Sequence, residues 1–149
     1  MPPTRIFVNI VVRDPLRAAR FYEEVFDLQR MFESEWFVHL GLPSNPGLEL
    51  GLLKQGYDVL PTALTHASNE ARTLLTIVVA NTDESYERAV AQGGECLERP
   101  RDLFYGQRRA VVRSPDGTLI DISSPCTPSS EWMARVAQKE GGGYVESSD

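Results

Sequence analysis

The chain repeats one order of strand and helix signals, and this internal repeat restricts its fold more than any other feature. The motif V-V-R-D at 11–14 is matched by V-V-A-N at 78–81, 67 residues later. Each motif ends an apolar run at a residue that caps helices well, Asp14 or Asn81. Short strand-like runs follow each helix signal. A repeat of this kind means that neither half can fully bury its sheet face alone.

The first half reads as a strand, a helix and three further strands. The run R-I-F-V-N-I-V-V at 5–12 is β-branched and nearly all apolar, as in a strand covered on at least one face. Asp14 and Pro15 open a helix that ends at Phe26, because proline lacks the N–H that the first turn leaves unpaired. Further strands are expected at 29–32, 36–42 and 47–53, with a turn at 44–47.

The second half repeats this order. A strand is expected at 73–79, and Asn81 with Glu84 three residues later forms a capping box for a helix that ends at Gln92. Gly93 and Gly94 then terminate the helix. The remaining strands are expected at 95–98, 107–113 and 118–123, the last two joined by the turn sequence S-P-D-G at 114–117.

These signals predict an α+β fold of two tandem βαβββ modules in a single domain over residues 1–126. Module one spans 4–54, a linker spans 55–71 and module two spans 72–126. The linker is polar and lacks periodicity, so it is either a plain connection or a lid over a pocket. Residues 127–149 are expected to form a short amphipathic helix near 131–138 and a frayed tail.

Charge and composition exclude several partners. The net charge is −6, whereas nucleic-acid binding normally requires a basic stripe, and an acidic surface does not favour anionic membranes. No apolar run approaches the roughly 20 residues needed to cross a bilayer, and no signal-peptide region is evident. Cys96 and Cys126 are too few for a disulfide framework. We therefore expect a cytoplasmic protein with reduced thiols.

Three strings, in order, resemble the vicinal oxygen chelate superfamily of glyoxalases, bleomycin resistance proteins and extradiol dioxygenases. They are V-V-R-D-P-L-R-A-A-R-F-Y-E-E-V-F-D-L at 11–28, L-E-L at 48–50, and F-Y-G-Q-R-R-A-V-V-R-S-P-D-G-T-L-I-D-I at 104–122. The likeness covers roughly residues 5–125. It implies curved mixed sheets around a cleft and a homodimer, with the modules paired within one chain or exchanged between two.

The resemblance also implies where a metal would bind. Metal-using members hold one divalent cation with four side chains, commonly two His and two Glu, and the matching positions here are Phe7, Glu49, Leu74 and Asp121. Both imidazoles are replaced by apolar side chains, so we expect neither a bound metal nor another cofactor. A divalent metal on the two carboxylates is the alternative. His39, in a strand, and His66, in the linker, lack ligand-like spacing, although either can line a pocket.

Strand alternation predicts which side chains face the cleft. An apolar cavity with a few polar groups is typical of small-molecule sites. The two carboxylates in it are expected to bind ligand, to be solvated, or to pair with an arginine such as Arg109. Trp36 and Tyr105 are either stacking walls or core. The predicted ligand-binding residues are Phe7, Asn9, Val11, Glu49, Leu74, Thr76, Val78, Tyr105 and Asp121.

Three functions remain open, because fold alone does not decide function. The first is a binding protein that sequesters a drug or hydrophobic metabolite and prefers cationic or neutral aromatic compounds. The second is a lyase, isomerase or dioxygenase whose catalytic residues are Glu49 and Asp121, as a non-standard metal site or as a base. The third is a regulatory, partner-binding role. Loss of both imidazoles with retention of two carboxylates favours the first.

Overall fold

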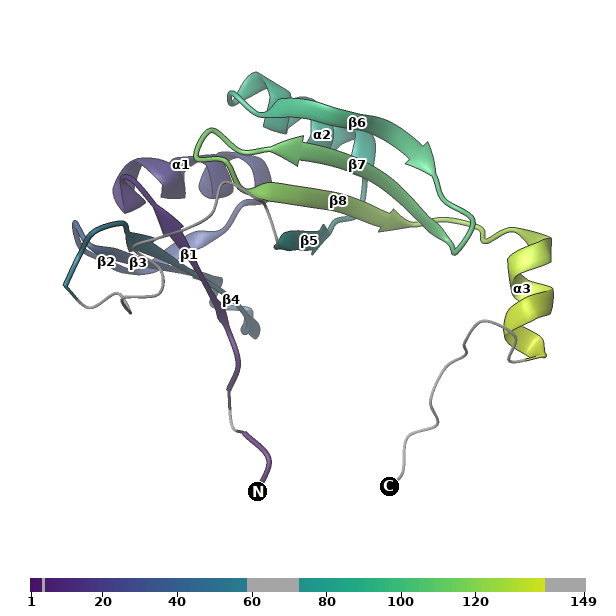
Figure 1. The fold of residues 1–149 in the computed structure, drawn as a ribbon, viewed down its shortest axis with the longest axis horizontal. Helices are drawn as coiled ribbons and strands as arrows, with labels where there is room; N and C mark the ends of the chain where they lie inside the picture. Colours follow the sequence, from purple (N-terminus) through teal and green to yellow (C-terminus); the bar gives the residue numbers. More distant parts are fainter. Residues whose placement is uncertain (4, 59–72, 139–149) are drawn as a thin grey trace.

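Two four-stranded sheets, each with one helix packed on it, form the body of the protein (Figure 1). The computed structural model describes residues 1–3, 5–58 and 73–138. Module one consists of β1 (Val8–Val12), α1 (Pro15–Phe26), β2 (Gln29–Glu33), β3 (Phe37–Leu42) and β4 (Asn45–Lys54). Module two consists of β5 (Leu74–Val78), α2 (Thr82–Ala91), β6 (Glu95–Asp102), β7 (Gln107–Arg113) and β8 (Leu119–Pro125), and α3 (Ser130–Ala137) follows it.

The two sheets have the same topology. Their strand orders are β1-β4-β3-β2 and β5-β8-β7-β6. In each sheet the first strand runs parallel to the last, and the other neighbours are antiparallel. The predicted α+β fold of two βαβββ modules is therefore confirmed.

Both module helices begin where the sequence predicts, because their caps act locally. The Asp14 carboxylate accepts a hydrogen bond from the Arg17 N–H (3.2 Å), and the Asn81 side chain accepts one from the Glu84 N–H (3.1 Å). Each bond satisfies a backbone donor that the first helical turn leaves free. Helix α2 ends at Ala91, one residue earlier than predicted, and Gly93 follows with a positive φ of 94°.

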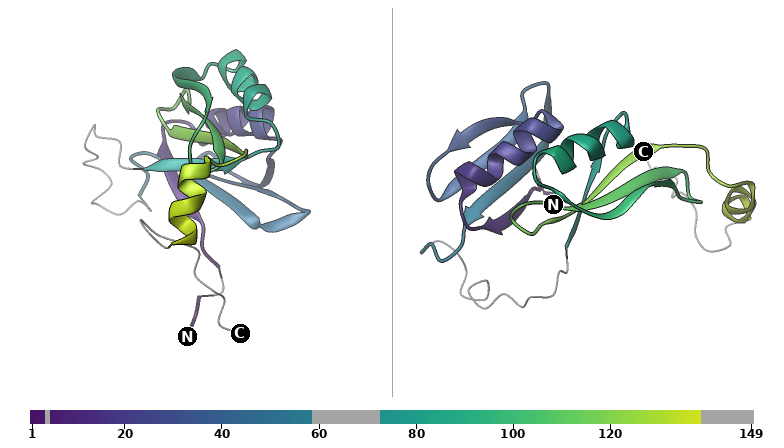
Figure 2. Two further views of the ribbon diagram at one scale, coloured as in Figure 1. Left: turned by 90° about the vertical axis from the view of Figure 1, so that its right-hand side faces the viewer. Right: turned by 90° about the horizontal axis from the view of Figure 1, so that it is seen from above.

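One hydrophobic core extends through both modules. It joins residues of the first sheet and α1, such as Leu52 and Val25, to residues of the second sheet, such as Ile120 and Ile122. Helices α1 and α2 lie side by side, as the view from above shows (Figure 2). The Arg88 guanidinium of α2 also donates to the backbone oxygen of Glu24 at the end of α1 (2.8 Å). The helices therefore connect the modules, and each covers one face of its own sheet.

The turn predicted at 44–47 is wrong in position. The chain turns at Pro43 and Ser44, and Asn45 already pairs with Leu42 as the first residue of β4. The register then shifts, so the segment after Asn45 forms a bulge in β4. The Asn45 side chain accepts a hydrogen bond from the Gly47 N–H (3.3 Å). The Asn45 side chain and the Gly47 backbone thus form a local hydrogen bond within β4 that is typical of a turn.

Strand β6 is longer than predicted, because it continues through Pro100 to Asp102. It lies at the edge of its sheet, and its register shifts twice, between Cys96 and Glu98 and again before Arg101. Proline lacks a backbone donor but is tolerated in edge strands and at bulges. The strand predicted at 95–98 therefore ends four residues too early.

After β8 the chain continues away from the sheets into α3, which projects at one end of the molecule (Figure 1). The Ser129 hydroxyl caps α3 by accepting the Trp132 N–H (3.0 Å), so the helix begins at Ser130, one residue before the predicted start. Trp132 contacts Phe104 edge to face, with ring centroids 5.2 Å apart. The lid proposed for the linker, His66 and the predicted frayed tail lie outside the described residues. Within the described ranges, no helix has the length and apolar character to cross a bilayer.

Candidate ligand-binding site

Each sheet has one face that no helix of its module covers, and apolar side chains of the first strands lie on it. In β1, Ile10 and Val12 pack on the core, which places Phe7 on the opposite face. Phe7 is 36% exposed, and Leu74 and Val78 of module two are 48% and 64% exposed. Exposed apolar groups on an open sheet face are typical of ligand or partner contacts.

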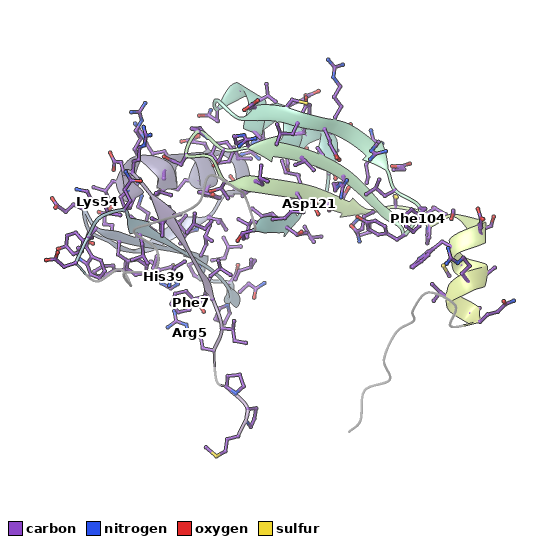
Figure 3. The ribbon with its side chains drawn as sticks, viewed as in Figure 1. Arg5, Phe7, His39, Lys54, Phe104 and Asp121 are labelled. Carbon is purple, nitrogen blue, oxygen red and sulfur yellow. The ribbon has the colours of Figure 1, made fainter. Side chains whose placement is uncertain are left out.

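In module one, Glu49 is held by two basic side chains. The Arg5 Nε donates to both Glu49 oxygens (2.7 and 2.8 Å), its terminal nitrogen also binds the carboxylate, and His39 Nε2 lies 2.9 Å from Oε1. The Arg5 guanidinium carbon also lies 4.6 Å from the centroid of the Phe7 ring. We call Arg5, Phe7, His39 and Glu49 the Arg5 cluster; Figure 3 labels Arg5, Phe7 and His39, which lie close together. The hydrogen bond from Arg5, more than the charge of His39, lowers the pKa of Glu49 below its usual value.

In module two, Asp121 is buried and held by neutral donors. The Thr76 hydroxyl donates to Asp121 Oδ2 (3.0 Å), and the Ser123 hydroxyl donates to Oδ1. Arg109, the arginine suggested as a partner for the carboxylates, donates instead to Glu98 (2.8 Å). Figure 3 shows Asp121 in the second sheet, well separated from Arg5 and its neighbours. The two carboxylates therefore do not face each other within one chain.

The strand register shows that Glu49 and Asp121 are not equivalent positions of the repeat. Asn9 lies opposite Gly51 in module one, and its equivalent in the repeat, Thr76, lies opposite Asp121 in module two. Asp121 therefore corresponds to Gly51, and Glu49 corresponds to Leu119. The resemblance matched Glu49 and Asp121 to the last strands of the two modules, and the register places them two residues apart along the repeat.

A side chain at Gly51 would have to displace the exposed Asn9 amide and would crowd the Phe37 ring. A Cβ built there would lie 2.0 Å from the Asn9 Oδ1 and 2.9 Å from a ring carbon of Phe37. The Asn9 amide thus fills the space that a side chain at this position would occupy. The open face of module one therefore has an amide where module two has the Asp121 carboxylate.

The aromatic candidates lie at the ends of the modules. Trp36 stacks on Tyr57, with ring centroids 5.4 Å apart and an angle of 9° between the planes. Tyr105 packs edge-on against Phe104, at the end of the second sheet that leads to α3 (Figure 3).

Arg5 is the one residue of the Arg5 cluster that was not among the candidates from the sequence, because an exposed arginine before a strand carries no local signal for its partner.

A family model describes residues 6–122 of the chain as glyoxalase/bleomycin resistance protein/dioxygenase superfamily. The chain belongs to this superfamily. The superfamily assignment agrees with the resemblance seen in the sequence, and it covers both modules. No curated protein matches the chain.

Solved structures show the same superfamily fold. A family enzyme from Burkholderia phytofirmans PsJN has a TM-score of 0.71 at 23% identity, over 80% of this chain and 96% of that one. A glyoxalase-related enzyme from Fulvimarina pelagi has a TM-score of 0.65 at 20% identity, over 82% and 88%. TioX from Micromonospora sp. ML1 has a TM-score of 0.62 at 20% identity, over 83% and 99%. Likeness at these identities establishes the fold alone.

The residues at the superfamily's metal positions do not fit a divalent metal. Of the four positions that the resemblance matches, Phe7 and Leu74 offer no donor atom, and the two carboxylates, Glu49 and Asp121, lie in different sheets. Such a metal needs several nitrogen or oxygen ligands at one point, and the Glu49 carboxylate is already bound by Arg5. Among the described residues, no three His, Cys, Asp or Glu side chains are grouped to hold a metal ion.

Replacement of Gly51 by alanine is expected to lower the free energy of unfolding by about 1–3 kcal/mol, because the new methyl group overlaps the Asn9 amide. The loss should be smaller when Asn9 is also alanine, which a double-mutant cycle in urea measures. Gly47→Ala, in the same strand, is the control, since its nearest atom lies 3.5 Å from a built Cβ. Equal stability of Gly51→Ala and wild type would contradict this packing.

Proposed function

We propose that the chain is a superfamily member that binds a small cationic or neutral aromatic molecule without a metal. The observation that carries the proposal is the state of the positions that the resemblance matches to metal ligands: Phe7 and Leu74 are apolar, and Arg5 binds the Glu49 carboxylate. These changes replace metal ligands with surface that suits an apolar ligand. A few polar groups on an apolar wall are the usual composition of a small-molecule site.

The state of Glu49 argues against an enzyme that uses this residue as its base. A general base works best when its pKa lies near the operating pH. Arg5 lowers the pKa of Glu49 instead, which makes its carboxylate a weaker proton acceptor. The alternative of a metal-free lyase or isomerase based on Glu49 therefore has no support in the site.

The proposed preference for cations rests on Asp121, and on Glu49 only where Arg5 is displaced. Asp121 has hydroxyl partners and no arginine within hydrogen-bonding distance in the described part of the chain. Glu49 is neutralised by Arg5, which comes from the exposed segment before β1. An acidic ligand gains nothing from Asp121, whereas a cation is attracted to it.

The ligand proposal can be tested with three compounds of one size: N-methylquinolinium, quinoline and quinoline-2-carboxylate. We expect calorimetry to show tighter binding of the first two, unchanged by a chelator, and weaker cation binding in the Glu49→Gln, Asp121→Asn double variant. Metal content is measured on protein purified without added metal. Tightest binding of the carboxylate, or a stoichiometric metal that Asp121→Asn loses, would contradict the proposal.

We also propose that the protein is a homodimer in which the open sheet faces of two copies enclose the ligand. Within one chain, α1 and α2 connect the modules, and the Arg5 cluster and Asp121 lie apart (Figure 3). The exposed Leu74 and Val78 lie on a sheet face that a second copy would cover. A cleft lined by both modules then forms between chains, as an exchange of modules requires.

We further propose a cytoplasmic location. Cys96 is exposed and Cys126 is half-buried, and both thiols are free. Disulfides are common in oxidising compartments and rare in the cytosol, so two unpaired thiols support a reducing environment. Fractionation of the source cells, with thiol labelling before lysis, tests this proposal. If both thiols are oxidised, and therefore do not react with the label, the proposal is contradicted.

A further inference from the structure

We propose that the Arg5 cluster is a recognition site for planar cations, namely guanidinium or amidinium groups, and that Arg5 is an internal ligand that such a molecule displaces. The inference rests on the proposed ligand-binding function and narrows it to one chemical class. It also gives the segment before β1 a role, since release of that segment would open the site.

The contacts around Arg5 match those that planar cations require. Its Nε lies 2.7 and 2.8 Å from the two Glu49 oxygens, and a second nitrogen of the same guanidinium also binds this carboxylate. A guanidinium presents several donors in one plane, which fits a carboxylate in a way that an ammonium does not. Glu49 is therefore oriented to accept a planar, multidentate cation.

Two rings complete the site. The guanidinium carbon lies 4.6 Å from the centroid of the Phe7 ring, within the range of a cation–π interaction. His39 Nε2 lies 2.9 Å from Glu49 Oε1, the oxygen that Arg5 Nη2 also binds, and 3.5 Å from that Arg5 nitrogen. The His39 and Phe7 rings lie 6.0 Å apart. An aromatic face, a carboxylate and an imidazole thus surround one planar group.

The receiving residues are fixed, whereas Arg5 is not part of a strand. Glu49 and His39 belong to β4 and β3, and the Glu49 side chain is only 10% exposed. Arg5 is 53% exposed and precedes the pairing of β1 with β4, which begins at Val8. Ion pairs with an exposed partner contribute little to stability, so exchange of Arg5 for an external cation is energetically accessible.

An external ligand has an advantage that Arg5 lacks. A cation attached to an aromatic ring can also cover exposed apolar surface of the open face of module one, such as Phe7. Burial of apolar surface contributes roughly 25 cal/mol per Å². Because Arg5 occupies the site in some of the molecules, the apparent association constant equals the intrinsic one multiplied by the fraction of molecules in which the site is free. Removal of Arg5 should therefore increase affinity.

The probe is benzamidine, a planar amidinium on a phenyl ring, with benzamide as its neutral counterpart. By calorimetry we expect Arg5→Ala to bind benzamidine about two- to sixfold more tightly than wild type, because the competing internal cation is gone. Arg5→Lys, which keeps the charge but loses the planar fork, should also bind more tightly than wild type. Arg113→Ala, which removes an exposed arginine paired with Glu95, is the matched control and should equal wild type.

The variant Arg5→Ala, Glu49→Gln should lose benzamidine binding, and benzamide should bind weakly throughout. Equal benzamidine affinity in wild type, Arg5→Ala and Arg5→Lys, or binding that survives Glu49→Gln, would overturn the inference. Circular dichroism confirms that each variant is folded. If quinoline binds wild type but benzamidine binds none of the variants, only this inference fails. If neither binds, the proposed function fails as well.

Discussion

Replacement of Leu52 by alanine is expected to lower the free energy of unfolding by about 2–5 kcal/mol, the usual range for removal of a large aliphatic side chain from a core. Leu52 is fully buried in β4, among residues of α1 and the first sheet. Ile122 of β8 is equally buried, and it belongs to the same core. Ile122→Ala should therefore destabilise the protein by a similar amount, although it lies in the other module.

The shared core also predicts that the two modules unfold together. If one core supports both modules, urea unfolding of either variant should remain a single transition that fluorescence and circular dichroism report alike. Leu48→Ala, at an exposed position of β4, is the control and should change stability by no more than about 0.5 kcal/mol. A split into two transitions would show that the modules unfold independently and that the repeat does not require a common core.

Dissociation into monomers is the expected result of placing aspartate at both Leu74 and Val78. These side chains lie on the open face of β5, which the proposed dimer covers. Burial of a carboxylate without a partner costs several kcal/mol, so two of them should raise the dimer dissociation constant by about a hundredfold or more. Sedimentation velocity over a range of protein concentrations measures this change.

A matched control separates the sheet face from the rest of the surface. Val90 is exposed on α2, and Val90→Asp introduces the same charge away from β5. This variant should remain dimeric. A wild-type protein that sediments as a monomer at tens of micromolar, or a Val90→Asp variant that dissociates to the same extent, would contradict the proposed interface.

Local signals in the sequence determined the elements and the family. The caps at Asp14 and Asn81 act on N–H groups three residues away, so helix starts follow from the sequence alone. The turn at 114–117 is equally local, because the Ser114 backbone oxygen accepts a hydrogen bond from the Gly117 N–H (2.9 Å). The repeat of these signals, 67 residues apart, predicted two equivalent modules, and the resemblance of three strings predicted the superfamily to which the chain belongs.

Contacts between distant residues determined the site, and only the tertiary structure shows them. Arg5 and Glu49 are 44 residues apart in sequence, and no local preference pairs a given arginine with a given carboxylate. The correspondence of Asp121 with Gly51 depends on strand register, which the hydrogen bonds between strands define. Alternation of side chains along a strand repeats every two residues, so the sequence pattern leaves the register ambiguous by multiples of two. The sequence thus determined which elements form, because capping and alternation act over a few residues. The packed sheets decided which charges meet, because that depends on how separate strands align.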